Sequence, residues 1–427
     1  MSAKIDNRQR TFLEVPIRAW RPIHYLGSKL RLTDSICEYI ADLSDGPVCD
    51  LFSGSGTVSL ALSKSHDVLA ADIQEYSRVL CTALLQPSSI SDQDVAHLLA
   101  RAERYQAESE RCIEPLLEYE RIAMRKADSR PELLADLVDH GSLMGGEVSG
   151  PLGAAVTATK RRLKKAGSSL MATRYFGGRY FSFQQAIFID SILNENAGAT
   201  YSAALLSTAS EIVNSIGKQF AQPMRPRRSD GSVKLHLIRQ MCRDRTQNAT
   251  EVFTAWLARY RAIRQSRPHR VVRGDYREVL KSAQDIAVIY ADPPYTRDHY
   301  SRFYHVLETL CLQDWPEVTS TFETGPVSRG LYRSERHQSP FCIKSQAPGA
   351  FAELFTLADG LPMLISYSPF VKDGHPRMMT VDAVAEIAKR HYRKVRVIPT
   401  NLVHSKLNKT DLHLGASDRA EVFVVCR

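Results

Sequence analysis

A glycine-bearing loop between two short apolar runs limits the fold of this chain more than any other feature. Residues 48–52 form the first run, the loop is Ser53-Gly54-Ser55-Gly56-Thr57, a helical pattern follows, and residues 68–71 form a second run that ends at Asp72. Strand, loop, helix and strand in this order are typical of a βαβ unit that starts a parallel sheet. We therefore expect an α/β fold, with further strands at 271–272, 286–291, 363–368, 394–399 and 421–426.

Length and composition exclude several other classes of protein. The 427 residues suggest two domains, or one large domain with an insert. With 44% hydrophobic and 24% charged residues, the chain is neither wholly disordered nor a small disulfide scaffold. No apolar run reaches the ~18 residues of a membrane-spanning helix, and the start MSAKIDNRQR is unlike a signal peptide. The eight scattered cysteines lack zinc spacing, which predicts reduced thiols in a cytoplasmic protein with no metal and no membrane partner.

Positive charge is concentrated in one part of the chain. Between residues 156 and 275 there are 21 Lys and Arg against 7 Asp and Glu, a net charge of +14. The rest of the chain has 35 against 40, a net charge of −5. A basic segment within a slightly acidic protein is the electrostatic signature of a polyanionic partner, and a basic but merely solvated surface is the alternative.

Helical patterns fill the space between the two groups of strands. We expect helices at 30–44, within 90–140, and at 184–216, 250–265, 301–313 and 380–391. Residues 1–20 are polar and predict a loose arm, while Gly, Ser and Pro predict a loop at 141–153. Residues 323–350, rich in Ser, Gly, Pro and Arg, predict a mobile loop.

The glycine loop and Asp72 together indicate a site for an adenosine-containing ligand. Glycines allow a positive φ and a close approach of the ligand to the main chain, and the helix after them offers free N–H groups. An acid at the end of the next strand can accept hydrogen bonds from both ribose hydroxyls. The loop differs from the dinucleotide fingerprint GxGxxG, because Ser59 stands where that fingerprint has its third glycine. This difference disfavours an NAD-type oxidoreductase.

The strongest chemical signal is Asp292-Pro293-Pro294-Tyr295, directly after an apolar strand. Two successive prolines fix φ and remove two N–H donors, so the turn is rigid and presents a carboxylate and main-chain carbonyls as acceptors. Such acceptors, beside an aromatic ring, suit an exocyclic amine on a planar base. A second element, Tyr25-Leu26-Gly27-Ser28-Lys29, offers an aromatic ring, a close backbone approach and a cation ahead of the first helix.

Along the chain the order is Tyr-Leu-Gly-Ser-Lys, the glycine loop, Asp72, a long insert and Asp-Pro-Pro-Tyr. In that order the four elements resemble the D12 class of amino-methylating DNA methyltransferases, typified by Dam, which use S-adenosylmethionine (SAM). The resemblance covers about 20–86 and 270–427. It implies a Rossmann-like SAM-dependent methyltransferase sheet with a large inserted, mainly helical target-recognition region. The expected parts are 20–86 for SAM binding, 87–269 for DNA recognition and 270–427 for catalysis. The family often has Trp where this chain has Tyr25, and Gly-Gly where it has Gly27-Ser28.

The resemblance also assigns roles to individual residues. Around SAM it places Tyr25 and Lys29 at the border, Asp50, Phe52, Gly54 and Gly56 in the loop under the methionine part, Asp72 at the ribose and Asp275 near the adenine. It also counts Asp292 among the residues that bind the cofactor. It assigns the target base to the catalytic residues Asp292, Pro293, Pro294 and Tyr295. Residues 297–300 (Arg, Asp, His and Tyr) would line the base pocket.

The implied reaction is methyl transfer to adenine N6 in double-stranded DNA, with the base flipped out of the duplex at a cost of a few kcal/mol. Asp292 and the Pro293 carbonyl would accept the two amine hydrogens, and Tyr295 would stack on the base. Cytosine N4, adenine in RNA, and an inactive nucleic-acid-binding relative stay open as alternatives. The insert would hold DNA through the basic residues Lys160, Arg161, Arg162, Lys164, Lys165, Arg225, Arg227 and Arg228.

Two further expectations concern the insert and the partners. The aromatic residues of the insert are expected in the core rather than against bases: Tyr175, Phe176, Tyr180, Phe181 and Phe183. A cognate restriction or defence-system nuclease is a candidate partner beside double-stranded DNA.

Overall fold

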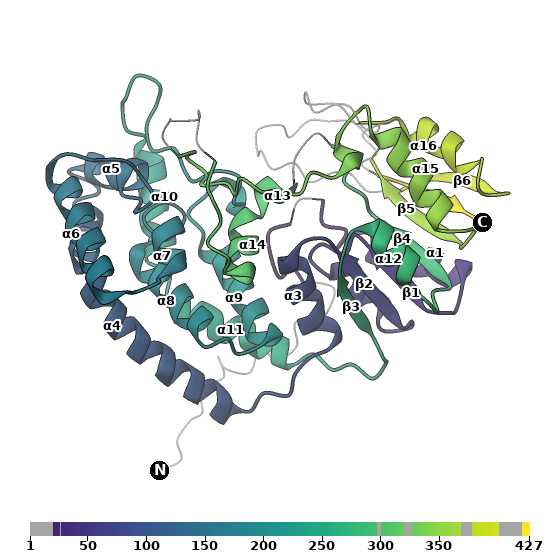
Figure 1. Ribbon diagram of the computed structural model, residues 1–427, viewed down its shortest axis with the longest axis horizontal. Coiled ribbons are helices and arrows are strands. Elements are labelled where there is room, and N and C mark those ends of the chain that lie inside the picture. The colour runs from purple at the N-terminus through teal and green to yellow at the C-terminus, as the bar shows by residue number, and fades with distance from the viewer. Residues whose placement is uncertain (1–19, 26, 297–299, 320–326, 369–377, 401–420) are drawn as a thin grey trace, which may run out of the picture.

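The computed structural model describes residues 20–25, 27–296, 300–319, 327–368, 378–400 and 421–427 (Figure 1). The expected N-terminal arm lies outside the described residues except for Trp20, which is buried and packs edge-on against Trp256 and Tyr260. Three residues of the expected base pocket, Arg297, Asp298 and His299, also lie outside them. Among the described residues no helix is long and apolar enough to cross a membrane.

The centre of the fold is a seven-stranded sheet with the order β3-β2-β1-β4-β5-β7-β6. Its strands are β1 (Val48–Leu51), β2 (Val68–Asp72), β3 (Arg270–Arg273), β4 (Val288–Ala291), β5 (Met363–Tyr367), β6 (Val395–Pro399) and β7 (Val422–Cys426). Neighbouring strands from β3 to β5 run parallel, and β7 lies antiparallel between β5 and β6. The α/β class and the predicted strand positions are confirmed.

The strand order places a crevice beside β1 and β4. β2 lies on one side of β1 in the sheet, and β4 lies on the other side. The connections after β1 and β4 therefore lead in opposite directions from this pair of neighbouring strands. In open α/β sheets ligands bind outside the carboxyl ends of the strands at such a point. Asp50 lies in β1, Asp72 ends β2 and Asp292 directly follows β4, so three of the predicted site residues meet near this edge.

Helices cover both faces of the sheet. One apolar cluster joins the sheet to α12 (Tyr276–Ser282), α15 (Ala347–Leu357) and α16 (Val381–Ala388). On the other face the apolar cluster includes α1 (Thr33–Leu43), α2 (Thr57–Leu62), α3 (Glu75–Leu85) and α14 (His305–Leu312). A short α13 (Tyr300–Phe303) precedes α14. Helices α13 and α14 come after the Asp-Pro-Pro-Tyr turn in the chain, and α14 packs against the sheet.

The segment between β2 and β3 is helical, as predicted. After α3 it contains α4 (Asp92–Arg125), α5 (Pro131–His140), α6 (Gly150–Ala166), α7 (Met171–Phe176), α8 (Phe183–Asn194), α9 (Ala199–Ile212), α10 (Leu235–Arg245) and α11 (Ala249–Arg261). Figure 1 shows α4, α5 and α6 at the end of the molecule opposite β6. Helix α9 packs on α3 and α11, so the apolar core of the sheet continues into this segment.

Two sequence expectations about loops were wrong in part. The loop predicted at 141–153 ends earlier, because α6 begins at Gly150 and Pro151 suits the first helical turn, where no N–H is needed. The loop predicted at 323–350 is packed where it is described: Leu331 and Phe341 are buried, and α15 begins at Ala347. A few buried apolar side chains anchor this segment, although its overall composition is polar.

The aromatic residues of the insert were predicted correctly. Tyr175, Phe176, Tyr180, Phe181 and Phe183 are all at most 4% exposed. They pack among themselves and against neighbouring rings, for example Tyr180 against Phe220. These five rings therefore stabilise the insert.

Candidate active site

A cavity of about 920 Å³, including the space at its open mouth, lies at the carboxyl ends of β1, β2 and β4. Its wall combines aromatic rings, three carboxylates and polar main chain. The residues that line it include Tyr25, Phe52, Asp72, Gln74, Tyr76, Gly274, Asp275, Tyr276, Asp292, Pro294, Tyr300, His337 and Cys342.

The glycine loop lets an aromatic ring reach the main chain beside this cavity. Gly54 has φ +52°, and a Cβ there would lie 2.7 Å from the Tyr25 ring. That ring is itself stacked on Tyr304, with centroids 4.9 Å apart. Gly56, with φ +73°, caps the start of α2, where a Cβ would lie 2.7 Å from Leu84. Both glycines are thus needed for conformation and for close packing.

Asp72 is fixed by main-chain donors on both sides. Its Oδ2 accepts a hydrogen bond of 2.9 Å from the Gly54 N–H, and its Oδ1 accepts one of 2.9 Å from the Gln74 N–H. Burial raises the pKa of Asp72, and these hydrogen bonds oppose the shift. Because each carboxylate oxygen can accept a second hydrogen bond, Asp72 can still bind hydroxyl groups in the cavity.

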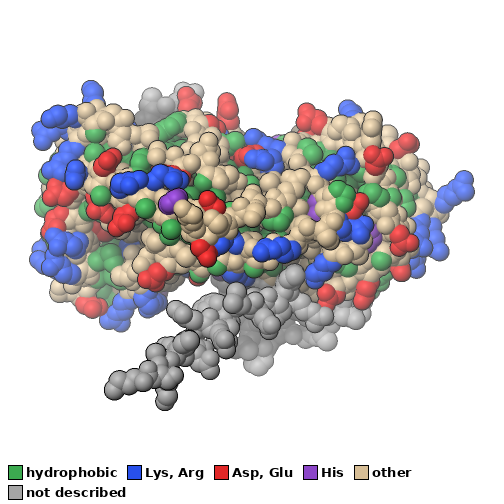
Figure 2. Space-filling view, turned by 90° about the horizontal axis from the view of Figure 1, so that it is seen from below, with side chains coloured by type: hydrophobic (Ala, Val, Ile, Leu, Met, Phe, Trp, Pro, Cys, Tyr) green, Lys and Arg blue, Asp and Glu red, His purple; other side chains and the backbone are tan. Residues whose placement is uncertain are grey.

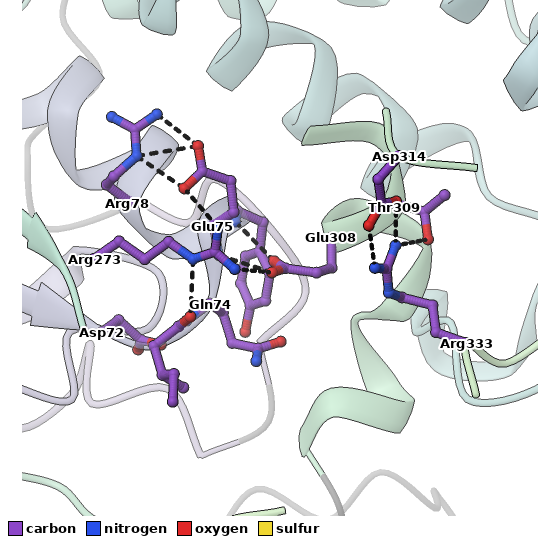
Figure 3. A network of polar contacts seen from close by, with 11 residues as sticks. Asp72, Gln74, Glu75, Arg78, Arg273, Glu308, Thr309, Asp314 and Arg333 are labelled. Carbon is purple, nitrogen blue, oxygen red and sulfur yellow. Dashed lines mark hydrogen bonds and ion pairs between the residues drawn. The ribbon is translucent and has the colours of Figure 1, made fainter. Parts of the chain in front are cut away.

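A network of polar contacts holds the turn that follows Asp72 (Figure 3). The Glu308 carboxylate of α14 accepts the N–H groups of Glu75 and Tyr76, at 3.0 Å each, and so caps the N-terminus of α3. Arg273, at the end of β3, donates to the Ile73 carbonyl and lies 3.7 Å from Glu308. The network thus joins the turn after β2 to the helix that follows the Asp-Pro-Pro-Tyr turn.

Asp292 forms a buried ion pair with Lys29. The distance from Lys29 Nζ to Asp292 Oδ2 is 2.9 Å, whereas Asp292 Oδ1 has no hydrogen bond to any described residue. Burial raises the pKa of Asp292 to about 6, although the Lys29 ammonium opposes the shift. Burial alone would lower the pKa of Lys29, but the carboxylates of Asp292 and Glu421 outweigh it and raise that pKa. Lys29 is therefore held as an ammonium next to a carboxylate that faces the cavity.

The structure brings about half of the predicted site residues onto one cavity wall. Those that line it are Tyr25, Phe52, Asp72, Asp275, Asp292 and Pro294, together with Tyr300. The others are buried and do not line the cavity: Lys29, Asp50, Gly54, Gly56, Pro293 and Tyr295.

Two of these buried residues have specific contacts. Asp50 accepts a hydrogen bond from the Ser59 hydroxyl of α2 and is 1% exposed. Burial raises its pKa to about 7, with the Ser59 hydrogen bond acting in opposition. Tyr295 is 5% exposed, packs 5.2 Å from Tyr367 between ring centroids, and donates to Glu421. In this arrangement neither side chain faces the cavity.

Sequence reasoning missed several residues of the site. Gln74, Tyr76 and Tyr276 follow β2 and β3 by only a few positions, so the rule that loops at the carboxyl ends of strands line the crevice would have found them. His337 and Cys342 come from the segment 323–350, which was predicted as a mobile loop and which is packed where it is described. Glu421 and Glu308 had no sequence signal, since each acts through contacts distant along the chain.

The predicted DNA-contacting residues fall into two groups. Lys160, Arg161, Lys164 and Lys165 are exposed on α6, which Figure 1 shows at the end of the molecule opposite β6. Arg225 and Arg228 are exposed near the hairpin closed by the Arg227–Val233 bridge.

Some of these cations already have acidic partners. Arg162 bonds to Glu114 at 2.7 Å, and Arg227 bonds to Asp136 of α5. Figure 2, which views the molecule from below, shows Lys and Arg interspersed with Asp and Glu at the α4–α6 end. Carboxylates partly neutralise the paired cations. The positive potential of the segment therefore comes mainly from its unpaired Lys and Arg.

Comparisons with known proteins agree with the resemblance in the N-terminal part. Residues 25–125 match the family of D12 class N6 adenine-specific DNA methyltransferases. The matched range includes Tyr25, the glycine loop and Asp72, and it ends before Asp292.

Three curated relatives match parts of the chain. Type II methyltransferase M.NlaIII of Neisseria lactamica is 28% identical over 143 residues, 34% of this chain and 38% of the relative. Type II methyltransferase M.FokI of Planomicrobium okeanokoites is 35% identical over 81 residues, 19% and 11% of the two chains. Modification methylase LlaI of Lactococcus lactis subsp. lactis is 34% identical over 114 residues, 27% and 16% of the two. The chain thus spans well under half the length of each of these relatives.

Proposed function

We propose that this chain, whose residues 25–125 match the D12 class, is a site-specific DNA methyltransferase that transfers a methyl group from SAM to adenine N6 in double-stranded DNA. One observation carries the proposal: the cavity that contains Asp72 and Asp275 also contains Asp292, with one oxygen of Asp292 tied to Lys29 and the other unbonded among the described residues. Acceptors for a nucleoside and an acceptor for an amine therefore face the same space.

The lining residues fit the chemistry of SAM. Asp72 and Asp275 supply acceptors for hydroxyl and amino groups, and Phe52 and Tyr276 supply an aromatic wall. The close packing that requires glycine at position 54 leaves the main chain near the cavity. When bound, SAM supplies a methyl group on a sulfonium, whose positive charge the three lining carboxylates would favour. We propose Tyr25, Phe52, Asp72, Asp275 and Asp292 as direct contacts, and Lys29, Asp50, Gly54 and Gly56 as supports behind them.

The Asp292 carboxylate and the Pro293 carbonyl would accept the two hydrogens of the adenine amine. The amine lone pair is otherwise delocalised into the ring, and these acceptors favour a tetrahedral nitrogen whose lone pair points toward the methyl group. Positioning and the acceptors for the charge that grows on nitrogen would supply most of the rate enhancement. The proton lost from nitrogen after transfer would leave by way of Asp292 or solvent.

The target base must be flipped out of the duplex, at a cost of a few kcal/mol. A base–aromatic stack is worth about 1–3 kcal/mol, so one ring can offset much of this cost. Tyr295 is buried against Tyr367, whereas Tyr300 lines the cavity, so we propose that Tyr300 stacks on the base and that Tyr295 supports the turn.

We propose that the helical segment 87–269 recognises DNA and that its exposed cations contact phosphates, which set position rather than sequence. Cytosine N4 in DNA and adenine in RNA stay second candidates, because both present an exocyclic amine to the same acceptors. The relatives named type II methyltransferase and modification methylase also make a cognate restriction nuclease a candidate partner.

The test is expression in a bacterial host that lacks DNA methylation, followed by single-molecule sequencing of its DNA. We expect N6-methyladenine in one short sequence context, and none in cells that express Asp292→Ala. N4-methylcytosine would change the assigned base. Absence of any modified base, together with SAM binding by calorimetry, would instead support an inactive nucleic-acid-binding relative.

A further inference from the structure

A third charged side chain, Glu421, completes the ion pair at the Asp-Pro-Pro-Tyr turn. Lys29 Nζ lies 3.1 Å from Glu421 Oε1, 2.9 Å from Asp292 Oδ2 and 3.0 Å from the Gly27 carbonyl. An ammonium has three N–H donors, so these acceptors account for all of them. Lys29 is therefore held in one place by groups from three separate parts of the chain.

The same oxygen of Glu421 also contacts the other end of the turn. The Tyr295 hydroxyl donates a hydrogen bond of 3.3 Å to Glu421 Oε1. Glu421 thus reaches Asp292 through Lys29 and reaches Tyr295 directly, so that it links the first and last residues of the Asp-Pro-Pro-Tyr turn. Its second oxygen, Oε2, is buried and has no hydrogen-bond partner among the described residues. A buried unpaired carboxylate oxygen costs free energy, which argues that Glu421 does more than fill space.

The backbone of Glu421 is itself fixed. Its carbonyl accepts hydrogen bonds from the N–H and the hydroxyl of Thr400, at 3.0 and 2.8 Å. Strand β7 begins at the next residue and pairs with both β5 and β6. The carboxylate is thus carried by a rigid part of the sheet, and it can hold Lys29 without moving when the cavity fills.

The charges explain why a second carboxylate is useful. With Asp292 as its sole anionic partner, a buried Lys29 would form a neutral pair, and much of the negative charge of Asp292 would be satisfied. Glu421 shares the ammonium. Asp292 then keeps more of its charge for a hydrogen-bond donor on the cavity side, where its Oδ1 has no partner among the described residues.

We propose that Glu421 is a positioning residue for methyl transfer, which acts through Lys29 and Tyr295 to keep Asp292 oriented and strongly accepting. This inference rests on the proposed function. Glu421 does not touch the base, the cofactor or the reacting atoms. Its loss should slow the chemical step while SAM and DNA still bind.

The experiment compares Glu421→Gln, Glu421→Asp and the wild type in single-turnover transfer of tritiated methyl groups from SAM to unmethylated genomic DNA. Glu386→Gln, an exposed carboxylate of α16 paired with Lys389, is the matched control. We expect a rate about ten- to a hundredfold lower for Glu421→Gln, partial recovery in Glu421→Asp, and wild-type affinity for SAM. A wild-type rate in Glu421→Gln overturns the proposal. If Glu421→Gln does not fold, a rate below the wild type in Glu421→Asp with intact SAM affinity supports the proposal, and either a wild-type rate or a loss of SAM affinity in Glu421→Asp overturns it.

A double-mutant cycle tests the route through Lys29. If Glu421 acts through Lys29, Glu421→Gln should have little further effect in a Lys29→Met background. Fully additive losses would overturn that route. A wild-type protein that methylates no DNA would refute the proposed function, whereas an active wild type with an unaffected Glu421→Gln would refute this inference alone.

Discussion

The Gly54 N–H donates a hydrogen bond of 2.9 Å to Asp72 Oδ2, which ties the loop after β1 to the end of β2. The same glycine lies directly under the Tyr25 ring. One residue without a side chain therefore sets the distance between the predicted ribose acceptor and the aromatic wall of the cavity. This explains why the glycine loop, the acid and the tyrosine occur together.

Replacement of Asp292 tests the catalytic role. We expect Asp292→Ala to lower methyl transfer by about a hundredfold or more, because the amine loses its charged acceptor. DNA affinity should change little, since phosphate contacts dominate it. Initial rates with tritiated SAM and DNA affinity by fluorescence anisotropy measure the two effects. Asp382→Ala, an exposed acid on α16, is the control, and a normal turnover in Asp292→Ala would remove Asp292 from the mechanism.

Replacement of Gly54 tests the packing against Tyr25. In Gly54→Ala the new Cβ would lie 2.7 Å from the half-buried Tyr25 ring, which is stacked on Tyr304, so the ring or the loop must shift. We expect SAM affinity to fall about tenfold or more in calorimetry, about 1.4 kcal/mol. Gly167→Ala is a matched control, because Gly167 has φ +62° but nothing within 4 Å. Equal SAM affinities in the two variants would show that the close approach is not required.

The raised pKa of Asp50 leads to a prediction of how the free energy of unfolding depends on pH. Burial raises its pKa to about 7 in the folded state, against about 3.9 when unfolded. The unfolded state therefore releases this proton first, and the contribution of Asp50 to stability is full below about pH 4 and is lost as the pH rises to about 7.

The Asp50→Asn variant does not titrate at this position. Its free energy of unfolding in urea, relative to the wild type, should rise between pH 5 and pH 8 by about 1 kcal/mol or more. A constant difference over that range would mean that Asp50 is ionised throughout.

The exposed cations of α6 predict the salt dependence of DNA binding. Arg161 and Lys165 have no acidic partner among the described residues, whereas Arg162 is paired with Glu114. If all three lie at the DNA, the double variant Arg161→Ala/Lys165→Ala should reduce the slope of log affinity against log salt concentration by about 2. Arg162→Ala should reduce it by less than 1. An unchanged slope in the double variant would place α6 away from the DNA.

The central part of the sheet could be predicted from sequence because β1, β2, β4, β5 and β7 are short, mostly apolar and buried runs. Asp72 and Asp292 each end or follow such a run, so the shared edge was predictable as well. The start of α6 was missed because Gly150 and Pro151 indicate a loop by composition, although they also suit a helix N-terminus. Phe341 was missed because one buried ring in a polar segment gives no periodic signal.

The contacts of Lys29 could not be predicted in the same way. The resemblance to the D12 class placed Lys29 at the border of the SAM site. Its acceptors come from residues 27, 292 and 421, and only the pairing of β7 between β5 and β6 brings the last of these to the turn.

The position of Glu421 also bears on biosynthesis. A ribosome completes the glycine loop early and the Asp-Pro-Pro-Tyr turn much later, and Glu421 emerges after both. Until β7 inserts between its two neighbours, Lys29 lacks one of its three acceptors. A nascent or truncated chain without β7 would therefore have the glycine loop but not the third acceptor of Lys29, and the link between the two ends of the Asp-Pro-Pro-Tyr turn would form only after β7 has paired.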